Sequence, residues 1–120
     1  MNIIGIGTDV VNVDRIKKAS SDENFLSRIL TAKELNSIDK NSKHIYERYA
    51  GRFAAKEAIV KSLGTGFNKD IKATDIEIIN NELGKPIVTI LNNNYKDIHV
   101  ELSISHTEDI ATAYAISFKD

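Results

Sequence analysis

The first quarter of the chain has the pattern of a strand followed by helical structure. Residues 4–9 alternate isoleucine and threonine with glycine and aspartate, which is the period of two that predicts a strand. Asn12 can then cap a short helix over residues 13–20, because its side chain can accept from a free backbone N–H of the first turn. Residues 21–29 continue the helical pattern.

The longest helix is expected near the middle of the sequence. Residues 31–34, Thr-Ala-Lys-Glu, form a capping-box pattern that opens one helix. A longer helix is predicted from about residue 43 to residue 63, and Gly64 supplies its stop. An apolar stripe at helical spacing assigns one face of this helix to the core. The stripe consists of Tyr49, Phe53, Val60 and Leu63.

Strand patterns dominate after residue 66. Residues 74–80 and 86–90 predict a hairpin whose second strand opens at the only proline, where proline is tolerated. Residues 99–106 and 111–118 predict a second hairpin. Helices early and antiparallel strands late indicate an α+β fold, with an N-terminal strand and helices and a long central helix packed on antiparallel hairpins.

The composition is that of an ordinary globular chain. Of 120 residues, 42% are hydrophobic and 28% are charged, and there is no cysteine. Nothing in length or composition divides the chain, so residues 1–120 are expected to form a single domain. No signal-peptide pattern and no apolar run of about 20 residues occurs, which predicts a cytoplasmic protein that does not enter a membrane. The lack of cysteine excludes disulfides and a cysteine nucleophile.

The charge argues against nucleic acid as a partner and suggests an acidic one. The net charge is −1, too low for general nucleic-acid binding. Residues 1–66 hold 11 Lys and Arg against 8 Asp and Glu, whereas residues 67–120 hold 5 against 9. Such an asymmetry commonly reflects only solvated faces. If it has a function, the N-terminal half faces something acidic.

Asp9 is the first candidate for chemistry. It shares one strand face with Gly5 and Gly7, and glycines in a strand often mark the close approach of another backbone or of a ligand. A carboxylate beside two bare positions is a candidate metal ligand with room for substrate. The commoner alternative is a turn or capping aspartate. A dinucleotide fingerprint is rejected because the third glycine is missing.

Glu57 and Lys61 are the second candidate. They lie four residues apart and share one helix face beside the turn of Gly64 and Gly66. An exposed pair of this kind is worth only about 0.3–0.5 kcal/mol, so a surface ion pair is the alternative. A carboxylate for a cation, a lysine for a phosphate oxygen and a glycine turn for close approach also make a coherent phosphate site. Mg²⁺ fits best, because it takes oxygen ligands, often one or two carboxylates with phosphates and water.

The third candidate is the tripeptide Ser105-His106-Thr107. Ser105 and His106 cannot form a catalytic pair within one strand, because neighbours point to opposite faces. His106 falls on the apolar face, where a histidine is commonly a structural core residue, and its place at the strand end makes a functional role an equal alternative. The other histidines, His44 and His99, show no zinc spacing.

Taken together, these features resemble the holo-acyl-carrier-protein synthases, the small phosphopantetheinyl transferases. The resemblance rests on the glycine-flanked aspartate, the string GRFAAKEAIVKSLGTG, the tripeptide GKP and the string SISHT, in this order over essentially all 120 residues. It implies the phosphopantetheinyl transferase fold. It also implies a reaction in fatty acid biosynthesis: coenzyme A gives its phosphopantetheine arm to a serine of apo-acyl carrier protein, and adenosine 3',5'-bisphosphate is released.

The resemblance also implies roles for individual residues. Asp9 and Glu57 would hold Mg²⁺ against the pyrophosphate of coenzyme A, and Lys61 would pair with a phosphate oxygen. The attacking serine belongs to the carrier, which accounts for the lack of a nucleophile in this chain. The remaining residues expected to bind coenzyme A are Gly64, Gly66, Ser105, His106 and Thr107.

Two kinds of partner contact follow from the same resemblance. It implies a homotrimer with active sites between neighbouring subunits, in which one chain supplies Asp9 and Glu57 and the next supplies Arg and Lys side chains. Carrier proteins are acidic along their recognition helix, and a basic face with an aromatic anchor is available near the first helices. This candidate docking face consists of Arg15, Lys18, Phe25 and Arg28.

Two other functions remain open at this level. One is a different Mg²⁺-dependent phosphoryl-transfer or hydrolase domain that releases phosphate from nucleotides without an acceptor protein. The other is a non-catalytic module whose charged helix docks an acidic partner. Metal-dependent binding of coenzyme A separates the enzymes from the module, and a mass gain on the acceptor separates transferase from hydrolase.

Overall fold

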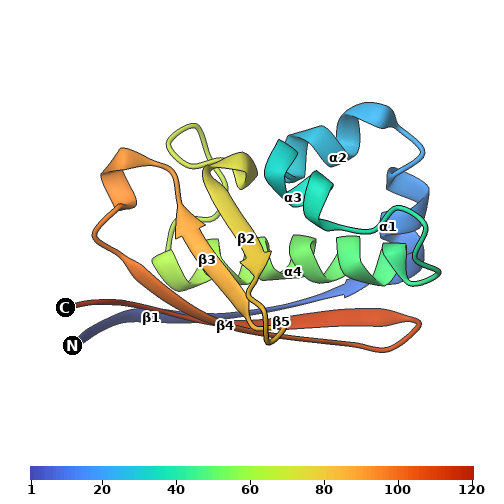
Figure 1. Cartoon of the computed structure of the whole chain (residues 1–120). Coiled ribbons are helices and arrows are strands. Elements are labelled where there is room, and N and C mark those ends of the chain that lie inside the picture. The colour runs from blue at the N-terminus through green and yellow to red at the C-terminus, as the bar shows by residue number, and fades with distance from the viewer.

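In Figure 1 a three-stranded sheet lies along the bottom, a long helix lies above it, and a two-stranded hairpin crosses over both in this view. The computed structural model describes residues 1–120. The α+β prediction is confirmed, with the long helix central to the fold. The elements in chain order are β1 (Asn2–Asn12), α1 (Val13–Ala19), α2 (Glu23–Ile29), α3 (Ala32–Ser37), α4 (Ile45–Leu63), the 3₁₀ turn η1 (Ala73–Asp75), β2 (Ile76–Asn80), β3 (Pro86–Ile90), the 3₁₀ turn η2 (Asn93–Tyr95), β4 (His99–His106) and β5 (Ile110–Lys119).

The larger sheet is antiparallel, in the order β1-β5-β4. Asn2 lies opposite Lys119, so both termini come to the same end of the sheet (Figure 1). Asp9 pairs with Ala113, which in turn pairs with Ile104 of β4. β1 pairs only with β5, so its other edge is free of strand partners in this chain. The β2–β3 and β4–β5 hairpins lie where the sequence places them.

Helix α4 packs on one face of this sheet through small side chains. Ala50, Ala54, Ala55 and Ala58 are fully buried, and the central strand meets the helix with alanines as well. Small residues on both surfaces let the helix axis approach the sheet closely, and the density of the contact offsets the small side chains. Of the predicted apolar stripe, Tyr49 and Val60 are buried, whereas Phe53 and Leu63 are only partly buried. The stripe of large residues was therefore an incomplete description of the core face.

Capping side chains fix the short helices. Asn12 accepts from the backbone N–H of Arg15 at the start of α1, and Thr31 and Glu34 form the predicted capping box of α3. The expectation that residues 13–29 are continuously helical is wrong. The chain breaks at residues 20–22, because Asp22 takes an extended conformation and caps a separate helix, α2.

A buried ion pair between Lys56 of α4 and Glu34 of α3 connects α4 with α2, α3, η1 and β2. Lys56 Nζ donates to Glu34 Oε1 at 2.6 Å, to the carbonyl oxygen of Ile29 at 2.6 Å and to that of Ala73 at 2.9 Å. Glu34 Oε2 accepts from the backbone N–H of Ile78 at 3.0 Å. Three acceptors satisfy all three ammonium protons, which is what allows a lysine to be only 1% exposed.

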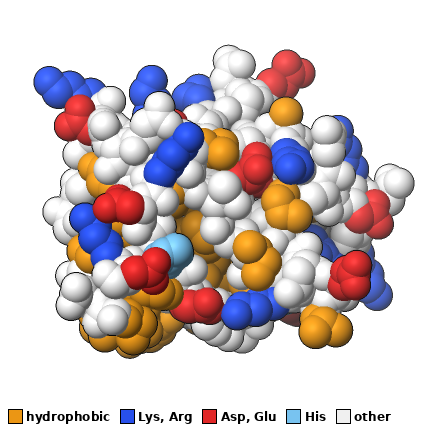
Figure 2. Space-filling view, turned by 60° about the vertical axis from the view of Figure 1, so that its left-hand side comes forward, with side chains coloured by type: hydrophobic (Ala, Val, Ile, Leu, Met, Phe, Trp, Pro, Cys, Tyr) orange, Lys and Arg blue, Asp and Glu red, His pale blue; other side chains and the backbone are white.

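The sheet face that turns away from α4 is apolar and open to solvent. Ile3, Ile6, Val10, Tyr114 and Ile116 are between 40% and 65% exposed. Apolar side chains gather at the lower left of the molecule in Figure 2, at the level where the sheet lies in Figure 1. A contiguous apolar surface of this kind commonly marks an interaction site. No helix in the chain is both long and apolar enough to cross a bilayer.

Candidate active site

The first candidate cluster lies where β1 meets the second half of α4. Lys61 Nζ donates to Asp9 Oδ1 at 3.1 Å and to the carbonyl oxygen of Thr8 at 3.1 Å. Glu57 lies one helical turn before Lys61 on the same helix face. One strand and one helix therefore bring Asp9, Glu57 and Lys61 together, and we call these three residues the carboxylate cluster.

The electrostatics of the carboxylate cluster suit a cation. Burial raises the pKa of Glu57, the charge of Asp9 raises it further, and the charges of Lys61 and Arg15 oppose the shift. The chain has no group of three or more His, Cys, Asp or Glu side chains that could hold a metal. Two carboxylates alone match Mg²⁺, which commonly completes its six ligands with water and substrate phosphates.

The two glycines of β1 serve the packing of α4. A Cβ atom at Gly7 would clash with the carbonyl oxygen of Ala58, and one at Gly5 would clash with that of Ser62. The prediction that these bare positions leave room for substrate is therefore wrong, because the backbone of α4 fills that space. Their contribution to the cluster is indirect: they let α4 approach β1 closely enough for Lys61 to reach Asp9.

The glycine turn after α4 has the backbone that its sequence suggests. Gly64 ends the helix with φ 78° and Gly66 has φ 62°, both in the left-handed region that favours glycine. The backbone N–H groups of Thr65 and Gly66 both donate to the carbonyl oxygen of Val60. The hydroxyl oxygen of Thr65 is buried and has no hydrogen-bond partner.

The second candidate cluster surrounds His106 at the end of β4. His106 lines a cavity of about 350 Å³ together with Arg48 and Arg52 of α4, and we call it the histidine cavity. Ser105 and Thr107 do not line it. The hydroxyl of Thr107 instead accepts from two backbone N–H groups of the β4–β5 turn. Of the three residues in the predicted Ser-His-Thr site, only His106 lines this cavity within a single chain.

Arg48 and Arg52 are the functional candidates that sequence reasoning missed. Arg52 Nη2 donates to Asn80 Oδ1 at 2.9 Å, and its Nε is buried without a partner. Burial lowers the pKa of Arg52, with a smaller opposing effect from the charge of Glu34. A guanidinium N–H left without a partner is a ready donor for an anion. The signal available in the sequence was two arginines four residues apart. In the structure, Gly51 between them faces Ile104 of β4.

The two clusters lie on opposite sides of α4. Glu57 and Lys61 follow Arg48 and Arg52, respectively, by nine residues, which is two and a half turns, so the two pairs point in opposite directions from the helix axis. No residue of the carboxylate cluster lines the histidine cavity. Within one chain, the predicted metal ligands and the predicted nucleotide residues are therefore not brought into one site.

The candidate docking face lies on α1 and α2. Phe25 packs against Phe53 with ring centroids 6.3 Å apart, which anchors α2 on α4. Lys18 pairs with Asp14 at 2.9 Å and Arg28 with Asp22 at 3.6 Å, so acidic neighbours partly neutralise both cations. Arg15 forms no ion pair, and its charge lowers the pKa of Glu57 in the carboxylate cluster, against the effect of burial.

Comparison with known proteins gives matches over nearly the full length. Residues 5–118 match the family model described as the 4'-phosphopantetheinyl transferase superfamily. The holo-(acyl-carrier-protein) synthase of Clostridium tetani (strain Massachusetts / E88) is 48% identical over 122 residues, covering 95% of this chain and 94% of that protein. The same enzyme of Fusobacterium nucleatum is 47% identical over 121 residues, covering 95% and 98%.

Solved structures agree. The holo-(acyl-carrier-protein) synthase of Bacillus anthracis str. Ames, in complex with CoA (3',5'-ADP), superimposes with a TM-score of 0.88 at 38% identity and covers 100% of both chains. That of Helicobacter pylori, in complex with coenzyme A, has a TM-score of 0.83 at 30% identity and covers 94% of this chain and 99% of the other. The chain belongs to the holo-acyl-carrier-protein synthases of the 4'-phosphopantetheinyl transferase superfamily.

Proposed function

We propose that this chain is a transferase that moves the phosphopantetheine arm of coenzyme A to a serine hydroxyl of apo-acyl carrier protein and releases adenosine 3',5'-bisphosphate. The observation that carries the proposal is the full-length match to holo-acyl-carrier-protein synthases. The carboxylate cluster supports it, because phosphoryl transfer depends on positioning and charge stabilisation more than on a protein nucleophile.

Asp9 and Glu57 are the proposed ligands of Mg²⁺. The raised pKa of Glu57 beside Asp9 is the supporting observation, since a divalent cation relieves the repulsion between the two carboxylates. When bound, Mg²⁺ supplies charge neutralisation on the pyrophosphate oxygens. Lys61 donates two of its three protons, to Asp9 and to the Thr8 carbonyl, and its side chain is half exposed. Its third proton is free for a phosphate oxygen.

The histidine cavity is the proposed seat of the nucleotide part of coenzyme A. Arg48 and the unpartnered Nε of Arg52 offer donors for phosphate, and His106 lies beside them. Ser105 and Thr107 would then contact the donor from the rim. Gly64 and Gly66 would let the phosphates approach the backbone at the end of α4.

We further propose a homotrimer whose active sites combine two chains. Three features support it: the carboxylate cluster and the histidine cavity lie on opposite sides of α4, β1 has a free edge, and the outer sheet face is apolar. In such an assembly, one chain supplies the carboxylate cluster and its neighbour supplies the histidine cavity. Covering the outer face would also remove apolar side chains from water.

The acceptor is proposed to dock on α1 and α2. Arg15, Lys18 and Arg28 supply positive charge, and Phe25 supplies the apolar contact. Residues 1–120 would act as one domain. The place of the reaction is then the cytoplasm, in the supply of holo-carrier for fatty acid biosynthesis, and the lack of cysteine suits a reducing compartment.

Mass spectrometry of the carrier tests the proposal. Purified chain, Mg²⁺, coenzyme A and an apo-acyl carrier protein should give a carrier heavier by one phosphopantetheine group, and a carrier whose acceptor serine is replaced by alanine should gain nothing. Release of phosphate or nucleotide without any mass gain would assign the chain to the hydrolases. Binding of coenzyme A without turnover would leave only a docking module.

A further inference from the structure

Helix α2, which carries part of the proposed docking face, is attached to the same turn of α4 that carries Glu57. Phe25 of α2 packs against Phe53, and Phe53 lies one turn before Glu57. The carbonyl oxygen of Ile29, the last residue of α2, accepts from Lys56 Nζ at 2.6 Å, and Lys56 directly precedes Glu57. Both contacts therefore lie within four residues of a proposed metal ligand.

The position of α2 depends on such tertiary contacts. The helix has seven residues, none of them fully buried, and a helix this short is not stable through its own hydrogen bonds. Its last carbonyl groups lack partners within the helix, and a positive charge at this end is favourable. The ammonium of Lys56 supplies both the donor and the charge, so it acts as the C-terminal cap of α2.

The hydrogen bonds of Lys56 fix a geometry that apolar packing alone leaves adjustable. Besides the Ile29 carbonyl, the ammonium donates to Glu34 Oε1 at 2.6 Å and to the Ala73 carbonyl oxygen at 2.9 Å. The three acceptors belong to α2, α3 and η1. Hydrogen bonds weaken steeply with distance and angle, so one buried ammonium sets the positions of three elements relative to α4.

Glu34 extends the same geometry beyond Lys56. Its Oε1 also accepts from the backbone N–H of Thr31 at 2.8 Å, and its Oε2 accepts from that of Ile78 in β2 at 3.0 Å. A displacement of Lys56 or Glu34 would therefore break hydrogen bonds in several elements at once.

Stability alone does not account for a buried ion pair at this place. Burial lowers the pKa of Lys56, against the effects of its hydrogen bond to Glu34 and of the charge of Glu34, so the ammonium is held there at a cost. Well-packed apolar side chains of similar volume are often as stabilising as a buried ion pair. What the ammonium adds is direction, because its three bonds hold α2 in one orientation beside Glu57.

We propose that Lys56 is a positioning residue for the acceptor: it holds α2 in the orientation in which a docked carrier presents its serine hydroxyl to the phosphorus atom at the carboxylate cluster. This role rests on the proposed transferase function and docking face. Lys56 is only 1% exposed, so it acts through α2 and does not touch the substrates.

The step that depends on this orientation is the attack on phosphorus. The serine oxygen forms a bond to the phosphorus atom of the phosphopantetheine phosphate, the bond from that phosphorus to the bisphosphate oxygen breaks, and the serine proton passes to water. Misplacement of a reacting group by about 1 Å can lower the rate of such a step on the order of 100-fold. Binding of the donor does not require α2 in this orientation.

Carrier labelling by two variants of Lys56 tests the role. Lys56→Met removes all three hydrogen bonds. Lys56→Arg keeps the buried charge pair, and with it the fold, but its larger head displaces α2. In both variants the kcat for labelling should fall at least about tenfold, whereas the calorimetric affinity for coenzyme A and the Mg²⁺ concentration for half-maximal activity should stay within about twofold of wild type. Saturating coenzyme A and Mg²⁺ in the labelling assay favour the folded chain of every variant.

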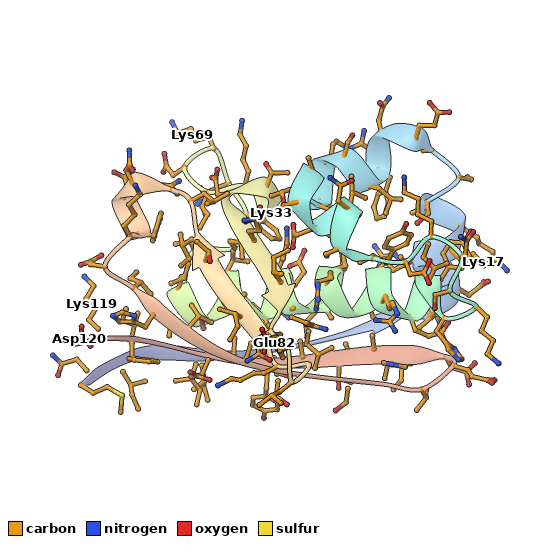
Figure 3. The ribbon with its side chains drawn as sticks, viewed as in Figure 1. Lys17, Lys33, Lys69, Glu82, Lys119 and Asp120 are labelled. Carbon is orange, nitrogen blue, oxygen red and sulfur yellow. The ribbon has the colours of Figure 1, made fainter.

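Two control variants separate position from stability. Leu102→Ala leaves a cavity in β4, which lies across α4 from α2 (Figure 1). Lys33→Met makes the same replacement as Lys56→Met at an exposed position of α3 (Figure 3). Denaturant unfolding gives the folded fraction of each variant. Leu102→Ala should have a lower midpoint than wild type, and per folded chain both controls should keep the wild-type kcat.

Three outcomes overturn the positioning role. A wild-type kcat in folded Lys56→Arg or Lys56→Met shows that the orientation of α2 does not depend on Lys56. An equal loss of kcat per folded chain in Leu102→Ala makes the effect one of stability. Weakened binding of coenzyme A or Mg²⁺ with an unchanged kcat makes Lys56 a support of the donor site instead. Wild-type chain that labels no carrier overturns the proposed function, and this role with it.

Discussion

Glu57 is the residue on which the proposed chemistry depends most directly. It lies between Asp9, which repels its charge, and two cations that stabilise it. Replacement by Gln keeps the shape and removes the charge, so Glu57→Gln should lower Mg²⁺ affinity and reduce turnover on the order of 100-fold, as for loss of other groups that stabilise transition-state charge. The measurement is carrier labelling against Mg²⁺ concentration. Glu82→Gln, at the exposed hairpin tip labelled in Figure 3, is the control and should behave as wild type. Near wild-type turnover of Glu57→Gln at low millimolar Mg²⁺ would remove Glu57 from the site.

The raised pKa of Glu57 also predicts how stability changes with pH. Folding raises this pKa, so the folded chain keeps the proton at pH values where the unfolded chain has lost it. Without metal, stability should therefore fall as pH rises from the ordinary glutamate pKa through the raised one. Glu57→Gln escapes this loss and should melt at a higher temperature than wild type at neutral pH, with a smaller difference at about pH 4. Thermal unfolding in chelator across this range is the measurement. A Glu57→Gln variant that melts lower at neutral pH would contradict it.

For single residues, the sequence indicates a role where that role depends on local spacing. It does not indicate a role that depends on a partner far away in the chain. Glu57 and Lys61 are one turn apart, so their shared face follows from helix geometry alone. Lys56 is next to Glu57 in sequence, yet its partner Glu34 lies 22 residues away on another helix. Arg52 likewise meets Asn80 only because β2 folds back beside α4. Neither pairing has a periodic signature.

At the scale of secondary-structure elements, the buried ammonium of Lys56 joins α4 to α2, α3 and η1 through hydrogen bonds. Lys56→Met should destabilise the fold by about 3–5 kcal/mol, because it leaves Glu34 as a buried charge without its partner. Lys33→Met removes an exposed lysine from α3 (Figure 3) and should change stability by less than about 0.5 kcal/mol. Denaturant unfolding at matched protein concentration measures both. Equal midpoints for the two variants would mean that Glu34 is satisfied without Lys56.

The elements themselves follow from sequence better than their packing does. Strand alternation, the capping box and the glycine stop are local signals, and the corresponding strands and helix ends are present. The packing of α4 on β1 depends instead on Gly5 and Gly7 meeting the carbonyl oxygens of the helix. A strand pattern predicts which face those glycines share but not whether a helix or a ligand approaches it.

For the whole molecule, the unequal charge of the two halves becomes a prediction about the partner. Arg15 is exposed on α1 and forms no ion pair, unlike Lys18 and Arg28. Arg15→Glu should raise the KM for an acidic carrier several-fold and flatten its salt dependence, since exposed charges act over a Debye length of about 8 Å at physiological salt. The KM for coenzyme A should change much less than the KM for the carrier, because Arg15 has the smallest of the effects on the pKa of Glu57.

Steady-state kinetics at two salt concentrations, varying each substrate in turn, measure this effect. Lys96→Glu changes the net charge equally on the connection between β3 and β4, at the end of the molecule away from α1 (Figure 1), and is the control. A carrier KM that stays constant while the coenzyme A KM rises would assign Arg15 to the carboxylate cluster, whose Glu57 its charge reaches.

The separation of the carboxylate cluster from the histidine cavity gives the sharpest test of assembly. Glu57→Gln leaves the histidine cavity intact, and His106→Ala leaves the carboxylate cluster intact. If each active site combines the cluster of one chain with the cavity of its neighbour, mixed trimers of these two inactive variants contain sites with both halves intact. Random assortment at equal amounts should restore about one quarter of the wild-type sites.

Unfolding and refolding the variants together, with each variant refolded alone as control, provides the mixture for a labelling assay. Sedimentation of wild type as a trimer should accompany the rescue, because a monomer has no neighbour to complete its site. A fully active monomer, or a refolded trimer mixture without rescue, would place the whole reaction within one chain.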